Sequence, residues 1–365
     1  MVKRVLLVIC VAVFMLRPLT AHAYADESIN SLADMAGAGE ISSEYLDRDE
    51  ISGEKNINIF QKLLEVISNT LKDNGRSVVS SFGLIMSAVV LCCVIHALKF
   101  GNSESLDTAT AYISIIVLSG VTYSVLYNLF VFAVAALESL TVAMTSFMPI
   151  MASLYAFGGA AASGAASASG LAVFLTALSA ICSKVILPLL QISFALCLSS
   201  AIPGGINLSS VTSLVRNTAT ILLSFAFTLM GFVLYLQTAV AAASDSFFSR
   251  SVRFASGVFV PVIGSMLGDA SRTVISSVSV IKSTVGAAVV VVILSLVLPP
   301  FLITVLHKFL LTLCSVLAKS LGCERESAFL CDLGGVLGIL MALIGGATAV
   351  CLIAMATFIR VGVSA

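Results

Sequence analysis

Long apolar stretches dominate this sequence, and each is long enough to cross a membrane as a helix. A transmembrane helix needs about 20 mostly apolar residues, because the hydrocarbon core of a bilayer is about 30 Å thick. Of the 365 residues, 59% are hydrophobic and 10% are charged, whereas a soluble domain averages about 25% charged residues. The sequence therefore predicts an all-α, polytopic membrane helix bundle. The candidate spans are 78–98, 109–136, 140–157, 171–200, 214–243, 284–306, 301–321 and 333–359.

Two of these stretches overlap, so the expected number of spans is seven or eight. The overlap contains "LVLPPFLITVLHKFLLTL", in which Pro299 and Pro300 each lack a backbone donor. The segment is either a proline-broken hairpin or one kinked helix. Eight spans would leave the C-terminus on the same side of the membrane as the start of the first span, and seven would leave it on the other.

Residues 1–25 have the pattern of a secretory signal peptide. Lys3 and Arg4 precede the apolar run "VLLVICVAVFML", which has the length of a signal-peptide core and is short for a membrane span. Small residues follow, and they predict cleavage after Ala23 or Ala25. The alternative is an uncleaved signal anchor.

Residues 26–77 form a polar segment that is expected outside the cytoplasm. Residues 26–76 contain eleven acidic and five basic residues, a net charge of −6. The pattern from Asn58 to Asn74 places apolar residues on one helical face and predicts an amphipathic helix that leads to the membrane. The segment has no cysteine, so it cannot form an internal disulfide.

Alternation through eight spans gives a topology that can be compared with the positive-inside rule. Signal cleavage places residue 26 outside the cytoplasm, so the first span runs inward. Spans one to five occupy 78–243, and spans six to eight occupy 284–365. Seven basic residues then lie on the cytoplasmic side and three near outer ends, in agreement with the rule. The seven are Lys99, Arg250, Arg253, Arg272, Lys282, Lys319 and Arg325, and the three are Arg216, Lys308 and Arg360.

Residues 244–283 do not resemble a simple span. The stretch "RFASGVFVPVIGSMLGDASRTVI" combines apolar residues with a proline, glycines and charges. One ionised side chain at mid-bilayer costs about 2.5–3.5 kcal/mol, so we expect two short helices meeting near Pro261–Gly264. They would lie amphipathically at the cytoplasmic surface, or re-enter the membrane to line a conduit or a subunit seam. The candidate structural or conduit residues here are Arg253, Gly257, Pro261, Gly264, Asp269 and Lys282.

Two further features of the membrane part leave alternatives open. Lys184 lies within an apolar stretch, and such a residue is either a functional group inside the membrane or a long side chain that reaches the interface. If Lys184 is deep, Glu138 or a backbone carbonyl near Pro188 would be its partner. The run "GGAAASGAASASG" (Gly158–Gly170) is expected to be a flexible loop, with close helix packing as the alternative.

The broken segment also resembles a known family. It is similar to the signature region of the stage III sporulation protein AE family, polytopic membrane proteins of endospore-forming bacteria, and "VILPL" (Val185–Leu189) and "LVRN" (Leu214–Asn217) fit the same pattern. Gly268 and Arg272 are not part of it. The matching positions are Phe254, Gly257, Phe259, Pro261, Val262, Gly264, Met266, Asp269, Ala270, Thr273, Val274, Ile275, Lys282, Thr284, Val285 and Gly286.

The resemblance implies a role in sporulation. It implies a membrane core subunit of a complex in the mother-cell membrane around the forespore, serving as a conduit or export-apparatus component. The implied partners are a separate ATPase, ring-forming bitopic proteins and small membrane proteins of the complex, and a homo-oligomer is compatible with this role. A secondary transporter and a scaffold that transports nothing are the alternatives.

The sequence carries little sign of covalent chemistry. It has no GxxxxGK[ST] motif, and "SVIK" (Ser279–Lys282) lacks the companion motifs of SxxK enzymes. His96 and His307 are far apart, and Cys323 and Cys331 lack metal-site spacing. The formal net charge is zero, so the overall charge does not indicate nucleic-acid binding. We therefore expect no catalytic, cofactor-binding or metal-binding residues.

Overall fold

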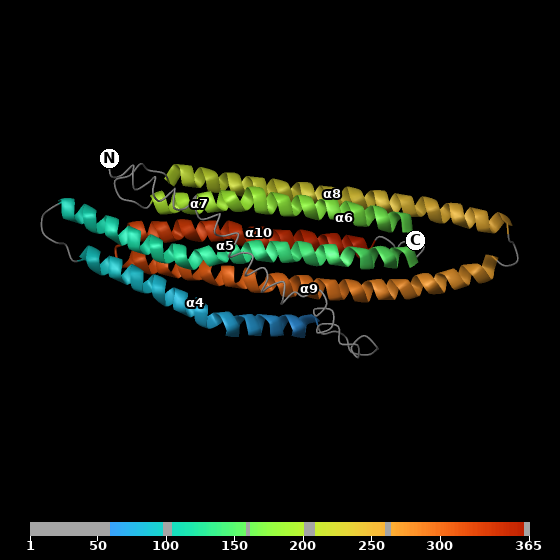
Figure 1. Ribbon diagram of the computed structural model, residues 1–365, viewed down its shortest axis with the longest axis horizontal. Helices are drawn as coiled ribbons and strands as arrows, with labels where there is room; N and C mark the ends of the chain where they lie inside the picture. Colours follow the sequence, from blue (N-terminus) through green and yellow to red (C-terminus); the bar gives the residue numbers. More distant parts are fainter. Residues whose placement is uncertain (1–58, 98–103, 158–160, 201–208, 260–263, 361–365) are drawn as a thin grey trace. The chain divides into compact units, whose positions relative to one another are not determined.

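The computed structural model describes residues 59–97, 104–157, 161–200, 209–259 and 264–360, and throughout these ranges the chain is helical apart from a short turn before residue 324 (Figure 1). A five-residue π-helical turn, η1, joins α6 to α7. The elements are α4 (Ile59–Ala97), α5 (Glu104–Phe157), α6 (Ala161–Ile181), η1 (Cys182–Ile186), α7 (Leu187–Ser200), α8 (Ser209–Phe259), α9 (Gly264–Ser320) and α10 (Glu324–Arg360).

Six candidate spans lie within the described helices, where the sequence predicted seven or eight. The all-helical membrane architecture is confirmed, and the lower number has a simple origin: two pairs of predicted spans are single helices. The stretches 109–136 and 140–157 both belong to α5, and the proline-containing pair belongs to α9. The six apolar stretches are Asn74–Ile95, Tyr112–Ala156, Ala168–Ser199, Ser210–Leu236, Val285–Ser320 and Glu324–Thr357.

Proline does not end these helices. Pro149 lies inside α5, and Pro299 and Pro300 lie inside α9, so the second of the two alternatives for the proline pair, one helix, holds. Each proline removes one backbone donor, but neighbouring hydroxyl groups can replace part of that bonding in an apolar setting. In α9 the carbonyl groups left without a helical donor are those of Ser295 and Leu296, and the 2.7 Å hydrogen bond that Thr304 donates to the Pro300 carbonyl oxygen lies one turn later.

The lower number of spans changes the expected topology. If each of the six apolar stretches crosses once, Lys99 and Arg325 lie at one side, and Arg253 and Lys282 lie at the other. The expectation that all seven of the cytoplasmic basic residues share a side is therefore wrong for a six-span chain. The cause is the continuity of α5, because one crossing in place of two reverses the direction of every later helix up to α9.

Helices also continue where shorter elements or loops were expected. The amphipathic helix predicted over Asn58–Asn74 and the first span are one helix, α4. The two short helices predicted on either side of Pro261 are the ends of α8 and α9, which run on into the apolar stretches. The small-residue run from Gly158 is helical from Ala161 onward, which contradicts the predicted loop.

The described helices divide into two compact units. The first comprises Met1–Ser139, Cys182–Leu223 and Val297–Gly345, and the second comprises Leu140–Ile181, Ser224–Leu296 and Gly346–Ala365. In the first unit, the buried Phe194 of α7 stacks on Tyr123 and packs against Phe130 of α5, with ring centroids 5.9 and 5.7 Å apart. Aromatic contacts of this kind add about 0.5–1.5 kcal/mol to the burial of apolar area.

The second unit depends on a close approach at Gly346 of α10. A Cβ atom at this position would lie within van der Waals overlap of the Phe227 ring from α8. We expect Gly346→Ala to destabilise the protein by roughly 1–3 kcal/mol, the usual cost of overpacking, in thermal unfolding of the detergent-solubilised chain. Gly334→Ala is the matched control, because a Cβ there meets nothing within 4 Å.

A second variant isolates the contact. Adding Phe227→Ala to Gly346→Ala should cost less than the sum of the two single changes, because the ring that clashes is gone. Strictly additive costs would show that Gly346 is needed for a reason other than its approach to Phe227.

Candidate functional site

Lys184 occupies an irregular point in a long apolar stretch. It lies in η1, near the middle of Ala168–Ser199, and its side chain is exposed. The irregularity has a local cause: Pro188 lacks the N–H group that would bond to the Lys184 carbonyl oxygen in an α-helix. π-Helical turns of this kind occur often at functional sites. A bilayer centred on this stretch would place the Lys184 ammonium where it needs water or a protein partner.

The candidate residues of the broken segment are placed only in part. Arg253 and Gly257 lie in the last turns of α8, and Asp269 and Lys282 lie in the first third of α9. Gly264 is the first residue of α9. Pro261 lies outside the described residues. The side chains of the others also lie outside what the structure describes, so their role as conduit or packing residues stays a prediction.

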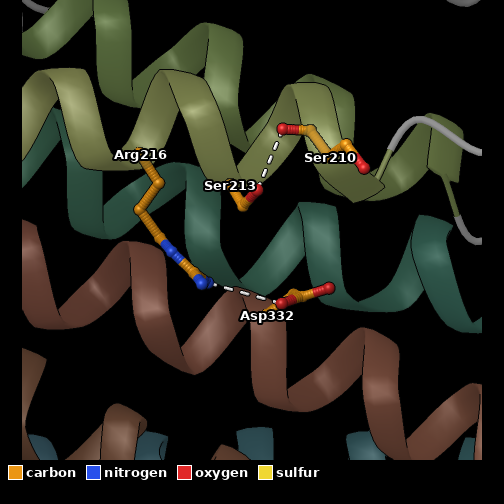
Figure 2. A network of polar contacts seen from close by, with 4 residues as sticks. All are labelled: Ser210, Ser213, Arg216 and Asp332. Carbon is orange, nitrogen blue, oxygen red and sulfur yellow. Dashed lines mark hydrogen bonds and ion pairs between the residues drawn. The ribbon is translucent and has the colours of Figure 1, made fainter.

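The structure adds an ion pair that sequence reasoning missed. The Arg216 guanidinium of α8 lies 3.3 Å from the Asp332 carboxylate of α10, joining helices more than a hundred positions apart in sequence (Figure 2). Both residues lie inside apolar stretches. From its position in the sequence, Arg216 was expected only as a charge near the outer end of a span.

Glycine makes room for this ion pair. A Cβ atom at Gly335, one turn after Asp332 on α10, would lie 2.6 Å from the Arg216 Nη1 atom. A second basic side chain approaches α10 at Gly338. A Cβ atom there would lie 3.2 Å from the Lys308 Nζ atom of α9, so the missing side chain of the glycine leaves room for the lysine. The sequence signal was present in "DLGGVLG" (Asp332–Gly338): an acid followed by glycines at helical spacing suits long basic side chains from neighbouring helices.

The local charge is unbalanced. Arg216 and Lys308 approach the face of α10 that carries one carboxylate, Asp332, and the structure records no ion pair for Lys308 among the residues it describes. The Arg216 and Asp332 side chains are 32% and 37% exposed. Neither side chain is fully buried within the protein.

A polar pocket lies beside Arg216. Its volume is about 590 Å³, and four of its six lining side chains are hydroxyl or amide groups. The pocket is open to the exposed surface of α8 near the first turns of that helix. Its lining residues are Ser210, Ser213, Leu214, Arg216, Asn217 and Thr220.

Among the described residues, no group of three or more His, Cys, Asp or Glu side chains could hold a metal ion. His307 is buried, and its Nδ1 atom lies 2.8 Å from the Ile303 carbonyl oxygen of its own helix. The arrangement suits holding helices together and contacting polar or anionic groups.

The ion pair gives a prediction on stability. Asp332→Asn should destabilise the protein by about 1–2 kcal/mol, below the roughly 3–5 kcal/mol seen when one partner of a fully buried pair is removed. Adding Arg216→Gln should restore part of the loss, because no unpaired charge remains. Thermal unfolding in detergent measures both effects, and Arg325→Gln at an exposed position of α10 is the control. A double variant as unstable as the sum of its parts would mean that the two groups do not interact.

Comparison with known proteins gives one consistent answer. No solved structure is significantly similar to this chain. A curated relative, "Stage III sporulation protein AE" of Bacillus subtilis (strain 168), is 25% identical over 244 residues, which is 66% of this chain and 60% of the relative. The match thus spans less than two thirds of that relative's length. The family model described as "Stage III sporulation protein AE" matches residues 42–362. Because the model covers most of the sequence, the chain belongs to the stage III sporulation protein AE family.

Proposed function

We propose that this protein is a membrane core subunit of a mother-cell-to-forespore complex that supports endospore development. In this role it serves as a conduit or export-apparatus component in the mother-cell membrane, and a separate ATPase supplies energy. Family membership supports a role in sporulation together with other proteins. The absence of a GxxxxGK[ST] motif in the sequence agrees with an external energy source.

One observation carries the proposal that the chain works inside a larger assembly: its apolar surface is too long for a bilayer to cover. On α5, exposed large apolar side chains extend from Ile113 through Val142 to Ile150. This distance is about 55 Å along the helix axis at ~1.5 Å per residue. A helix tilted by about 40° has only about 39 Å inside a 30 Å core. This excess length favours coverage of part of α5 by other protein.

A secondary transporter is the second candidate. The π-helical turn at Lys184 and the unbalanced site at Arg216 and Lys308 favour it, since transporters use broken helices and intramembrane charges. Against it, the acids well inside the apolar stretches are Glu138 and Asp332, and Asp332 is already paired. Ion coupling through carboxylates has few groups to use, so we favour the conduit. A scaffold that transports nothing would explain why other protein covers the apolar surface of α5, but it would give Lys184 no role.

The proposed topology has the start of the mature chain outside the cytoplasm. With six spans, the ends of α8 and α9 on either side of residues 260–263 then lie on that exported side, facing the compartment between the two membranes. This differs from the cytoplasmic position expected from eight spans. In the proposed complex, Arg253, Gly257, Gly264, Asp269 and Lys282 are placed to meet ring-forming partners there.

The assembly is tested by co-purification from sporulating cells. We expect the tagged parent chain to recover the ATPase and the ring-forming proteins. Gly257→Glu and Gly264→Glu should lower that recovery and the spore yield at least about tenfold, because charge and bulk at these glycines oppose close packing. Gly257→Ala and Gly264→Ala are the controls, since they add one methyl group and no charge. A parent chain that recovers neither partner would overturn the proposal.

The topology is tested with single cysteines and a membrane-impermeant thiol reagent. In intact cells that produce the chain outside sporulation, Asp269→Cys and Gly158→Cys should be labelled. Lys99→Cys should be labelled only after the cells are opened. Identical behaviour of Asp269→Cys and Lys99→Cys would show that α5 crosses the membrane twice. Labelling of Lys99→Cys alone would place the start of the chain in the cytoplasm.

A further inference from the structure

The helix α8 carries an exposed polar face that crosses the whole apolar stretch. Between Ser210 and Tyr235, polar or small residues recur every three or four positions, and each is exposed. At 1.5 Å per residue this face is about 38 Å long, more than the ~30 Å thickness of a hydrocarbon core. Its residues, which we call the α8 polar face, are Ser210, Ser213, Asn217, Thr220, Ser224, Thr228, Gly231 and Tyr235.

Two other faces of α8 show that the pattern is not a general polarity of this helix. The face packed against the rest of the chain is mainly apolar, with Thr212 as its one hydroxyl residue. The third face is exposed and mainly apolar, with Leu214, Ile221 and Phe225 all at least 60% exposed and Thr218 as its exposed hydroxyl residue. The apolar exposed face suits lipid, and the polar exposed face does not. The remaining residues of the packed face are Ala219, Leu223, Ala226, Met230 and Leu234.

Local hydrogen bonds satisfy this face only in part. Ser213, Thr220 and Thr228 donate to carbonyl oxygens one turn earlier, at 2.8–2.9 Å. The Asn217 amide has no hydrogen bond among those of the described residues. An unpaired amide placed in an apolar environment costs about 1–3 kcal/mol, and the lone pairs of the hydroxyl groups add to this cost. Against lipid, this face would therefore be unfavourable at Asn217, about two turns from its start.

A hollow lies at one end of the same face. The pocket of about 590 Å³ is lined by Ser210, Ser213, Asn217 and Thr220 together with Leu214 and Arg216. It is open to the surface at the first turns of α8, so a polar solute or water has room beside these side chains. The Arg216–Asp332 ion pair at its wall is about one-third exposed on both sides.

We propose that the α8 polar face lines a water-filled path through the assembly. This inference rests on the proposed function and names the surface that the conduit uses. Water on the polar face supplies the hydrogen bonds that lipid cannot, and the exposed apolar face of the same helix contacts lipid. The path begins at the Arg216 pocket and follows α8 across the membrane. Its walls are neutral hydroxyl and amide groups, with one arginine at the entrance, so it suits polar solutes.

The inference is tested with pairs of neighbouring residues that share one depth but lie on different faces. The pairs are Thr220 and Ile221, Ser224 and Phe225, and Thr228 and Leu229, each replaced singly by cysteine. A small, charged, membrane-impermeant thiol reagent is applied to cells in which the complex has assembled, and the parent chain gives the background of native cysteines. We expect the polar member of each pair to react about tenfold faster or more, because a thiol in apolar surroundings stays protonated and unreactive.

Two results would overturn the inference. Slow reaction at both members of every pair would show that the polar face is sealed by lipid or protein. Disulfide formation between two copies at Ser224→Cys under oxidising conditions, together with protection from the reagent, would show that the face is a helix–helix seam. A variant that fails to accumulate in the membrane is replaced by the pair Gly231 and Phe232, which repeats the pattern about one turn after Thr228, and both of which are exposed.

The outcome is separable from that of the proposed function. Protection of the polar face in cells that form spores, and from which the partner proteins still co-purify, would overturn the water-filled path alone. Faster labelling of the polar member of each pair, with no partner protein co-purified, would overturn the proposed complex and leave the water-filled path in place.

Discussion

Hydrogen bonding of the backbone is the constraint on which this structure depends. In an apolar environment each unpaired N–H or C=O group costs several kcal/mol, and a continuous helix satisfies these groups within one segment. Pro149, the Pro299–Pro300 pair and the small-residue run after Gly158 would favour breaks in a soluble chain. Here the helices continue through the prolines and through most of the small-residue run, and η1 is the irregular turn that the structure describes inside an apolar stretch.

The glycines of α10 explain how long side chains fit between such helices. In the first unit, the missing side chain leaves room for Arg216 at Gly335, for Lys308 at Gly338 and for the ring of Phe301 at Gly345. In the second unit, Gly346 does the same for Phe227. Each glycine gives the space of a missing side chain to a residue of another helix. The helix α10 contains the most buried of the six apolar stretches, as expected of an element that is packed on several faces.

The sequence predicted the class of fold because hydrophobicity alone identifies helices that suit a membrane. It did not predict that α5 is one helix, since Glu138 between two apolar stretches resembles a turn between two spans. Lys184 was named from its apolar surroundings, and its role stays a prediction. The contact of Arg216 with Asp332 depends on which helices are neighbours, and hydropathy carries no such information. The candidates around Pro261 rest on family resemblance and keep that status.

The π-helical turn has a consequence for the register of the helix that follows it. A π-helical turn contains one residue more than the equivalent α-helical turn, and each residue rotates a helix by about 100°. Deleting one residue from Cys182–Ile186 would therefore turn α7 on its axis relative to α6. Leu190 and Phe194, which are buried, would turn away from their neighbours. A single inserted residue thus sets which side of α7 faces the core, while both ends of the span stay where they are.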